Sequence, residues 1–275
     1  MGRGVRALGI CVLLAALAGR SRGGEARNDG EEAMGARRRF HLYLLIGQSN
    51  MAGRGAVAKE DKTPHPRVFA LNQQDEWVPA AEPLHFDKPM AGVGPGLAFG
   101  KAMAEANPRA KVGLIPCSAG GSPISVWTKG GYWKQTRSRP YDEALRRVAV
   151  ARRRGVLKGI LWHQGESDSN STDAPLYAER LDALIARLRR DLRAPKTPVL
   201  VGGLSDHLIA RNRHAKAVDR ALRQLPERVE RTAYVPAEGI GLKSDNAHFT
   251  APAARTLGRR YAKALLSLRT PQSPR

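Results

Sequence analysis

Apolar runs and amphipathic stretches alternate along most of this chain, and no other feature of the sequence constrains the fold as strongly. The apolar runs predict buried β-strands at residues 42–46, 67–71, 111–116, 157–162 and 198–201. Apolar residues recur at helical spacing over residues 96–106, 141–154, 175–193, 214–225 and 252–268. This alternation predicts a three-layer α/β/α sandwich around a central, mostly parallel sheet. Such sheets bind ligands at the carboxyl ends of their strands, so the polar segments after each strand matter most for function.

The chain of 275 residues suits a single domain, which we expect at residues 40–270. Positive charges followed by an apolar run at residues 7–18 predict a signal peptide and leader over residues 1–24. Residues 25–39 are rich in Gly, Glu and Arg, which predicts a disordered linker. The apolar run falls short of the roughly 20 residues that span a bilayer, so we expect a secreted or periplasmic protein without a membrane span. Cys117 is the one cysteine outside the signal, so no internal disulfide is expected.

The formal net charge of +21 permits affinity for polyanions such as nucleic acid or an acidic polysaccharide. The excess is mostly arginine spread over predicted helices without interleaved aromatic residues, as on solvated helix faces. We therefore expect no nucleic-acid partner. Affinity for acidic glycans stays open as an alternative to a mere compositional excess of arginine. The sequence carries no signal of the oligomeric state.

Ser49 directly follows the first predicted strand, in the segment GQSNMAG (47–53). A serine at a strand-to-loop junction between small residues is placed as a nucleophile needs to be, although an isolated serine there is more often a cap or turn residue. After the strand at 111–116 comes CSAGGS (117–122), where Gly120 and Gly121 bring backbone N–H groups close to a ligand, as an oxyanion hole requires. A plain tight turn is the alternative for this glycine pair.

The segment WHQGESD (162–168) places an amide and three ionisable groups at the carboxyl end of another strand. Gln164 is a candidate donor to a developing oxyanion, while Glu166 and Asp168 are suited to hold the loop or to contact sugar hydroxyls. A metal site would need these carboxylates and His163 to converge with a further ligand. A His-x-x-Glu spacing on a non-helical turn matches no familiar metal site, so no metal is expected.

Asp245 and His248 lie in KSDNAHFT (243–250), just before the last predicted helix. Alone, this spacing is more often a helix-capping arrangement. Together with Ser49 it completes the set that acyl transfer needs: a nucleophile, an imidazole that takes its proton, and a carboxylate that orients the imidazole.

These segments, in this order, resemble the SGNH hydrolases, and among them the sialate O-acetylesterase-like carbohydrate esterases of family six, over residues 40–268. The resemblance implies a flavodoxin-like α/β/α fold and no cofactor. By position, it implies Ser49 as the nucleophile, His248 as the general base and then acid, and Asp245 as the group that orients His248.

The same resemblance implies an oxyanion hole built from the backbone N–H of Ser49, the side chain of Gln164, and a backbone N–H of Gly120 or Gly121. Gly121 is favoured of the two. The residues expected to support the site or bind substrate are Gln48, Asn50, His163, Glu166 and Trp127.

The sequence thus predicts a carbohydrate O-acetylesterase that acts through an acetyl-serine intermediate. One alternative is a lipid- or thioester-directed SGNH esterase, which should carry an apolar groove, whereas Asn50, Arg54 and Trp127 indicate a polar, sugar-like site. The other alternative is a non-catalytic carbohydrate-binding protein, which would lack one of the three catalytic side chains. Residues 59–90 match no motif, so the glycan is not specified.

Overall fold

The computed structural model describes residues 1, 32 and 34–269. The chain divides into two units, Met1–Gly35 and Ala36–Arg275, and every helix and strand named below belongs to the second. Apart from Met1, the predicted signal peptide at residues 1–24 lies outside the described residues.

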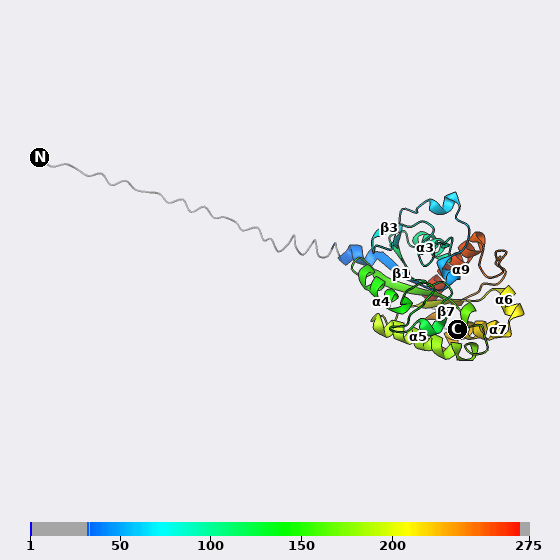
Figure 1. Ribbon diagram of the computed structural model, residues 1–275. Coiled ribbons are helices and arrows are strands. Elements are labelled where there is room, and N and C mark those ends of the chain that lie inside the picture. Colours follow the sequence, from blue (N-terminus) through cyan, green and yellow to red (C-terminus); the bar gives the residue numbers. More distant parts are fainter. Residues whose placement is uncertain (2–31, 33, 270–275) are drawn as a thin grey trace, which may run out of the picture. The chain divides into compact units, whose positions relative to one another are not determined.

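A seven-stranded sheet forms the centre of the second unit, in the order β3-β2-β4-β1-β5-β6-β7 (Figure 1). Its strands are β1 (Phe40–Gly47), β2 (Val68–Leu71), β3 (Trp77–Pro79), β4 (Lys111–Pro116), β5 (Val156–His163), β6 (Val199–Gly202) and β7 (Thr232–Val235). Neighbouring strands are parallel except for β2 with β3, which confirms the mostly parallel sheet. β1 lies between β4 and β5 and is buried from Leu42 to Gly47, which explains its continuous apolar run.

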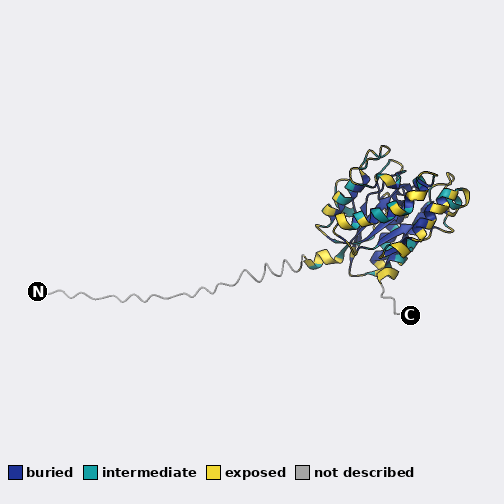
Figure 2. Cartoon of the chain, turned by 90° about the horizontal axis from the view of Figure 1, so that it is seen from below, coloured by how far each residue is buried: buried dark blue, intermediate teal, exposed yellow. Residues whose placement is uncertain are grey.

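Helices cover both faces of the sheet, which confirms the three-layer sandwich. The α-helices are α2 (Ser49–Ala52), α3 (Pro95–Ala106), α4 (Pro140–Ala151), α5 (Tyr177–Asp191), α6 (Asp206–Arg211), α7 (Arg213–Arg223), α8 (Leu225–Arg228) and α9 (Ala251–Arg269). Short 3₁₀ turns lie at Lys59–Lys62, Ile124–Val126, Glu166–Asp168 and Ala174–Leu176. One core cluster joins the sheet to α4, α5 and α7, and the other joins it to α3 and α9 (Figure 1). Figure 2 shows the strands buried between helices whose outer faces are exposed.

Two strands escaped prediction because their sequences lack a strong burial pattern. β3 has three residues and none of them is buried, while β7 has four residues of which two are only half-buried. Short edge strands of this kind carry little periodicity. The remaining strands lie within one or two residues of their predicted bounds.

The prediction of a disordered linker up to residue 39 is wrong for residues 36–39, which are helical. Ala36 and the three arginines that follow it favour helix. The Nε of Arg37 also donates a hydrogen bond to the carbonyl of Arg152 at 3.1 Å, which ties this turn to the end of α4. Within the described residues no helix is both long and apolar enough to cross a membrane.

Candidate active site

Ser49 opens the short helix α2 at the carboxyl end of the central strand β1. The N–H of Gln48 donates to the carbonyl of His163, at the end of β5, at 3.0 Å, so the turn is tied to the neighbouring strand. Gly47 adopts a φ of 133°, and a Cβ atom at this position would lie 2.1 Å from the carbonyl oxygen of His163. Only glycine fits there, which explains why the nucleophile candidate follows a Gly-Gln pair.

His248 faces Ser49 from the loop before α9. Its Nε2 lies 3.0 Å from Ser49 Oγ, and its Nδ1 lies 2.9 Å from Asp245 Oδ2. The sequence placed these three side chains 199 and 3 positions apart, and the fold brings them into one chain of hydrogen bonds. The His248 imidazole is 28% exposed, so a substrate can reach it from solvent.

Asp245 is held in place by its own loop. Its Oδ1 accepts hydrogen bonds from the backbone N–H groups of Ala247 (3.0 Å) and His248 (2.9 Å). Burial alone would raise the pKa of Asp245, but the hydrogen bonds from His248 and Ala247 outweigh it and hold that pKa well below its usual range. The carboxylate therefore stays ionised and orients the imidazole across the neutral pH range.

Asn50 clamps the segment around His248. Its Nδ2 donates to the carbonyl of Ala247 at 3.0 Å and to Glu166 Oε1 at 2.6 Å, while its Oδ1 accepts the N–H of Phe249 at 3.1 Å. One side chain thus contacts the residues on both sides of His248. This placement suits the predicted supporting role of Asn50 and Glu166, since the described partner of the Ser49 hydroxyl is His248.

The glycine turn after β4 offers one free backbone donor. The N–H of Gly120 is already engaged, because it donates to Asp87 Oδ2 at 2.9 Å. Gly121, with a φ of 78°, has a backbone N–H without an acceptor among the described residues. The N–H of Ser49 is also without an acceptor among those residues, as expected in the first turn of a helix. The geometry therefore favours Gly121 over Gly120 as an oxyanion donor.

Asp87 and its partner Arg54 form a support that motif analysis did not assign. The Arg54 guanidinium lies 2.8 Å from Asp87 Oδ2, and both side chains are almost completely buried. The pair holds the N–H of Gly120 and so positions the glycine turn. Asp87 falls within the unassigned residues 59–90, where a polar cluster between prolines was the one signal and its spacing matched no motif.

Gln164 departs from its expected role. Its amide nitrogen lies 3.1 Å from Gln48 Oε1, 3.1 Å from the carbonyl of Ser122 and 2.5 Å from Asp168 Oδ2, and the residue is fully buried. An amide group has two protons, and three protein oxygens already surround them. In this structure Gln164 therefore has no proton left for an oxyanion and acts as a support beneath the site, contrary to the expectation from sequence.

Gln48 lies next to Ser49 and is also almost completely buried, at 4% exposed. Its Oε1 accepts the amide of Gln164 and the backbone N–H of Ser167, at 3.1 and 3.3 Å. Because a backbone N–H can only donate, this contact fixes which end of the Gln48 amide is oxygen. Its Nε2 has no hydrogen-bond partner among the described residues. It is not among the polar atoms that are fully enclosed by the protein and lack a partner. The Gln48 amide nitrogen therefore remains free to donate a hydrogen bond beside Ser49.

Two further candidates lie in the protein interior. His163 is fully buried, with Nδ1 3.2 Å from the hydroxyl of Tyr261, and burial lowers its pKa, so it is a neutral support. The prediction that Trp127 binds substrate is wrong: its side chain is fully buried, packs edge-on against Trp162 and donates to Ser122 Oγ at 3.0 Å. A tryptophan closer to the site is Trp133, whose indole N–H donates to the carbonyl of Gly120 at 3.0 Å. No cluster of His, Cys, Asp and Glu side chains suited to a metal occurs among the described residues.

A serine hydroxyl, an imidazole and a carboxylate thus lie in series at the carboxyl edge of a parallel sheet, beside two backbone N–H groups that lack acceptors among the described residues. This constellation is suited to acyl transfer. Fold and site together fit a serine-type carboxylic ester hydrolase with a three-layer α/β/α fold.

The chain belongs to the family of carbohydrate esterases described as sialic acid-specific acetylesterases, whose sequence model matches residues 39–267. It is 35% identical over 249 residues to an Arabidopsis thaliana protein described as a probable carbohydrate esterase, covering 82% of this chain and 90% of that protein. The crystal structure of an Arabidopsis thaliana protein, 34% identical, superposes with a TM-score of 0.73 and covers 82% of this chain and 98% of that one.

Two more distant relatives agree with this assignment. A probable 9-O-acetyl-N-acetylneuraminic acid deacetylase of Escherichia coli is 23% identical over 199 residues, which cover 56% of this chain and 61% of that protein. The crystal structure of NanS, at 17% identity, shares the fold with a TM-score of 0.69 and covers 84% of this chain and 98% of that one.

Proposed function

We propose that this protein removes O-acetyl groups from a carbohydrate, with Ser49 as the nucleophile, His248 as the proton carrier and Asp245 as the group that orients His248. The observation that carries the proposal is the continuous chain of hydrogen bonds from Ser49 Oγ through the His248 ring to Asp245, at 3.0 and 2.9 Å. Membership of a carbohydrate acetylesterase family supports the choice of acyl group and of substrate class.

In the first step Ser49 Oγ attacks the ester carbonyl while His248 Nε2 takes the hydroxyl proton. The ionised Asp245 accepts a hydrogen bond from Nδ1 and stabilises the imidazolium that forms. Negative charge develops on the carbonyl oxygen, and the backbone N–H groups of Ser49 and Gly121 are the donors available to it. His248 then protonates the departing sugar oxygen, which leaves an acetyl group on Ser49.

In the second step water replaces the sugar. His248 takes a proton from the water, whose oxygen attacks the acetyl carbonyl, and the proton returns to Ser49 Oγ as acetate leaves. The free amide nitrogen of Gln48 adds a third donor. It lies on the same side as the glycine turn, because Gln164 Nε2 contacts both Gln48 Oε1 and the carbonyl of Ser122. No step requires a cofactor.

Polar surroundings support a sugar over a fatty acyl chain as the substrate. Ser49 is flanked by the amides of Gln48 and Asn50, and the indole of Trp133 lies against the glycine turn. Aromatic faces and amides are the groups that bind sugar rings. A lipid-directed esterase would instead need an apolar groove beside the nucleophile.

The proposal is tested by incubating the purified protein with acetylated xylan, acetylated pectin and O-acetylated sialosides, and measuring released acetate. Ser49→Ala should lower the rate by roughly 10⁴-fold or more, because removal of the nucleophile leaves only oxyanion binding. Ser171→Ala is a matched control, since Ser171 is exposed and forms no hydrogen bond with a described residue. Full acetate release by Ser49→Ala, or release of long-chain acids without acetate, would contradict the proposal.

We also propose that the protein is exported, on the strength of the charged and apolar N-terminal residues 1–18. Acetylated polysaccharides lie largely outside the cell, so an extracytoplasmic location would bring the enzyme to its substrate. Fractionation of expressing cells tests this, and an unprocessed protein confined to the cytoplasm would contradict it.

A further inference from the structure

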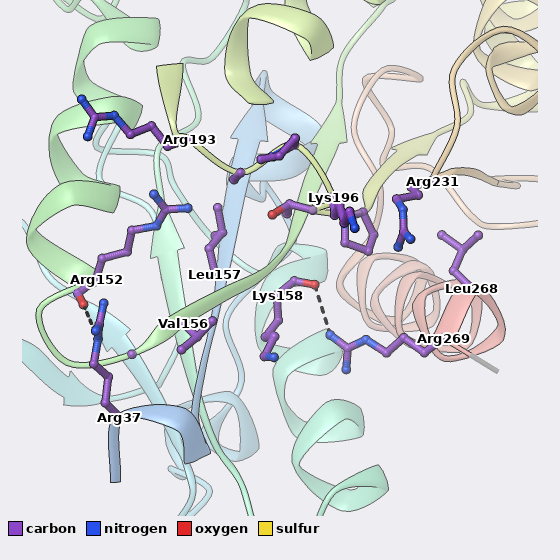
Figure 3. Close-up of a pocket in the computed structure, with 15 residues that line it drawn as sticks. Arg37, Arg152, Val156, Leu157, Lys158, Arg193, Lys196, Arg231, Leu268 and Arg269 are labelled. Carbon is purple, nitrogen blue, oxygen red and sulfur yellow. Dashed lines mark hydrogen bonds between the residues drawn. The ribbon is translucent and has the colours of Figure 1, made fainter. Parts of the chain in front are cut away.

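A second, strongly cationic pocket lies at the opposite edge of the sheet, with a volume of about 750 Å³ (Figure 3). Its walls are residues that immediately precede strands: Gly155 before β5, Pro198 before β6 and Arg231 before β7. These are the amino ends of parallel strands, whereas Ser49 lies beyond the carboxyl end of β1. β5 has eight residues and so separates the two edges by roughly 25 Å. Occupation of this pocket would leave the ester-binding site open.

Seven cationic side chains and no acidic one line this pocket. None of these seven forms an ion pair with a described carboxylate. Some arginines elsewhere are paired with carboxylates: Arg147 pairs with Asp75, and Arg255 pairs with Asp61. In this pocket seven cationic side chains gather with no acidic side chain beside them.

Several of these cations are held in place by carbonyl groups. Arg37 Nε donates to the carbonyl of Arg152, and Arg152 in turn donates to the carbonyl of Leu192. Arg269 Nη2 donates to the carbonyl of Lys158 at 3.1 Å (Figure 3). Carbonyl acceptors orient a guanidinium without cancelling its charge. Burial first, and then the charge of Arg37, lowers the pKa of Arg152, which shows that the two cations repel each other.

The backbone conformation of two pocket residues is a separate observation about this pocket. Arg193 and Arg231 adopt left-handed conformations, with φ of 48° and 56°. Such conformations favour glycine or asparagine, and a side chain as long as arginine gains nothing from them locally. The side chains of Arg193, Arg231 and Lys196 form no hydrogen bond or ion pair with a described residue. Three free cations thus line the pocket, two of them at positions where the backbone disfavours a long side chain.

We infer that this pocket binds an anionic polysaccharide, holding a carboxylated or sulfated glycan chain at the edge of the sheet away from Ser49. The pocket falls within the range of about 300–1,000 Å³ typical of ligand sites, so it can take more than one charged sugar unit. No aromatic side chain lines it, so it lacks the stacking platforms with which proteins hold single-stranded nucleic acid. The choice of a glycan among polyanions rests on the proposed function.

The test measures binding of polygalacturonate, which carries carboxylates but no acetyl groups, to the purified protein by titration calorimetry. The pocket variant is Arg193→Asn/Lys196→Gln/Arg231→Asn, whose asparagines suit the left-handed backbone. The control is Arg211→Gln/Lys216→Gln/Arg220→Gln, which removes the same charge from exposed side chains of α6 and α7. We expect the pocket variant to bind about tenfold or more weakly and the control within about twofold of the parent, with binding that weakens as salt rises.

Hydrolysis of para-nitrophenyl acetate is measured on the same samples, so the two proposals fail separately. Equal losses in the pocket variant and the control, or no binding at about 50 mM salt, would overturn the pocket while leaving the esterase intact. If only the pocket variant loses binding and none of the proteins hydrolyses the ester, the proposed polysaccharide site is supported and the proposed esterase activity is contradicted. Tighter binding of duplex DNA than of polygalacturonate through the same three residues would overturn the assignment to a polysaccharide.

Discussion

The two edges of the sheet handle charge in opposite ways. At the carboxyl edge, Asp245 accepts hydrogen bonds from His248, and Arg54 is paired with Asp87 although both are buried. At the amino edge, Arg193, Lys196 and Arg231 have no carboxylate partner among the described residues. Paired charges hold fixed geometry, which chemistry requires, whereas unpaired charges remain available to a partner.

This difference predicts that salt acts unequally on the two edges. Buried or directly hydrogen-bonded pairs are screened little, while exposed like charges are screened strongly above about 0.1 M salt. Hydrolysis of a small neutral ester should therefore vary little with ionic strength, and polyanion binding should vary steeply. A steep salt dependence is then expected of the cationic pocket and not of the catalytic site.

Asp245→Asn tests the pairing at the carboxyl edge and should have the largest effect. An asparagine presents an N–H to His248 Nδ1 and so favours the wrong imidazole tautomer, which lowers kcat by roughly 10³–10⁴-fold while leaving the geometry intact. Steady-state hydrolysis of para-nitrophenyl acetate measures the loss. The control is Asp142→Asn, because Asp142 lies in the first turn of α4 and accepts only the N–H of Gly130. Undiminished kcat in Asp245→Asn would show that this carboxylate does not orient the imidazole.

Gln48→Met tests the role of the Gln48 amide at the same edge of the sheet, and its expected effect on kcat is smaller. Methionine keeps the length of the side chain but removes the amide donor, so kcat should fall by about 10²-fold with little change in KM if that donor stabilises the transition state. The thermal midpoint is measured alongside, since loss of the Gln164 and Ser167 contacts would also destabilise the fold. A normal kcat in Gln48→Met, with a large loss in Gln164→Met, would return the donor role to Gln164.

The sequence allowed most of the fold to be predicted because its central strands are buried on both faces. Strands such as β1 and β4 must be continuously apolar, and that pattern is visible without coordinates. The short edge strands β3 and β7 bury only part of their residues and left no comparable pattern.

For the site, residue types and local order were enough to place Ser49, Asp245 and His248, since each lies at the end of a strand or just before a helix. The sequence could not predict the roles of residues whose function depends on contacts with distant parts of the chain. Gln164 and Trp127 have the right chemistry for a substrate, but packing against Asp168 and Trp162 turns both inward. Asp87 has no motif around it, and only the folded chain brings it to Gly120.

Glu82 gives the prediction with the smallest expected effect, and it concerns a buried carboxyl group near the carboxyl edge of the sheet. This carboxyl lies beneath the loop that packs on α2, where it accepts the backbone N–H groups of Leu84 at 3.0 Å and Gly94 at 3.4 Å. Burial raises its pKa from 4.5 to about 8, so the folded protein keeps it neutral near pH 7. Between these two pH values the folded state binds a proton that the unfolded state has released, so stability falls as pH rises from 4.5 through about 8.

Glu82→Gln should remove this dependence, because the amide keeps an acceptor and cannot ionise. Relative to the parent, its thermal midpoint should be unchanged near pH 4.5, where both proteins are neutral at this position, and higher by about 3 °C or more at pH 9. Thermal unfolding at the two pH values measures the difference. Glu105→Gln, on the solvent side of α3, controls for the loss of an exposed charge. An equal shift of Glu82→Gln at both pH values would mean that Glu82 titrates alike in the folded and unfolded protein. Its ionised form would then be tolerated in the interior without a cationic partner.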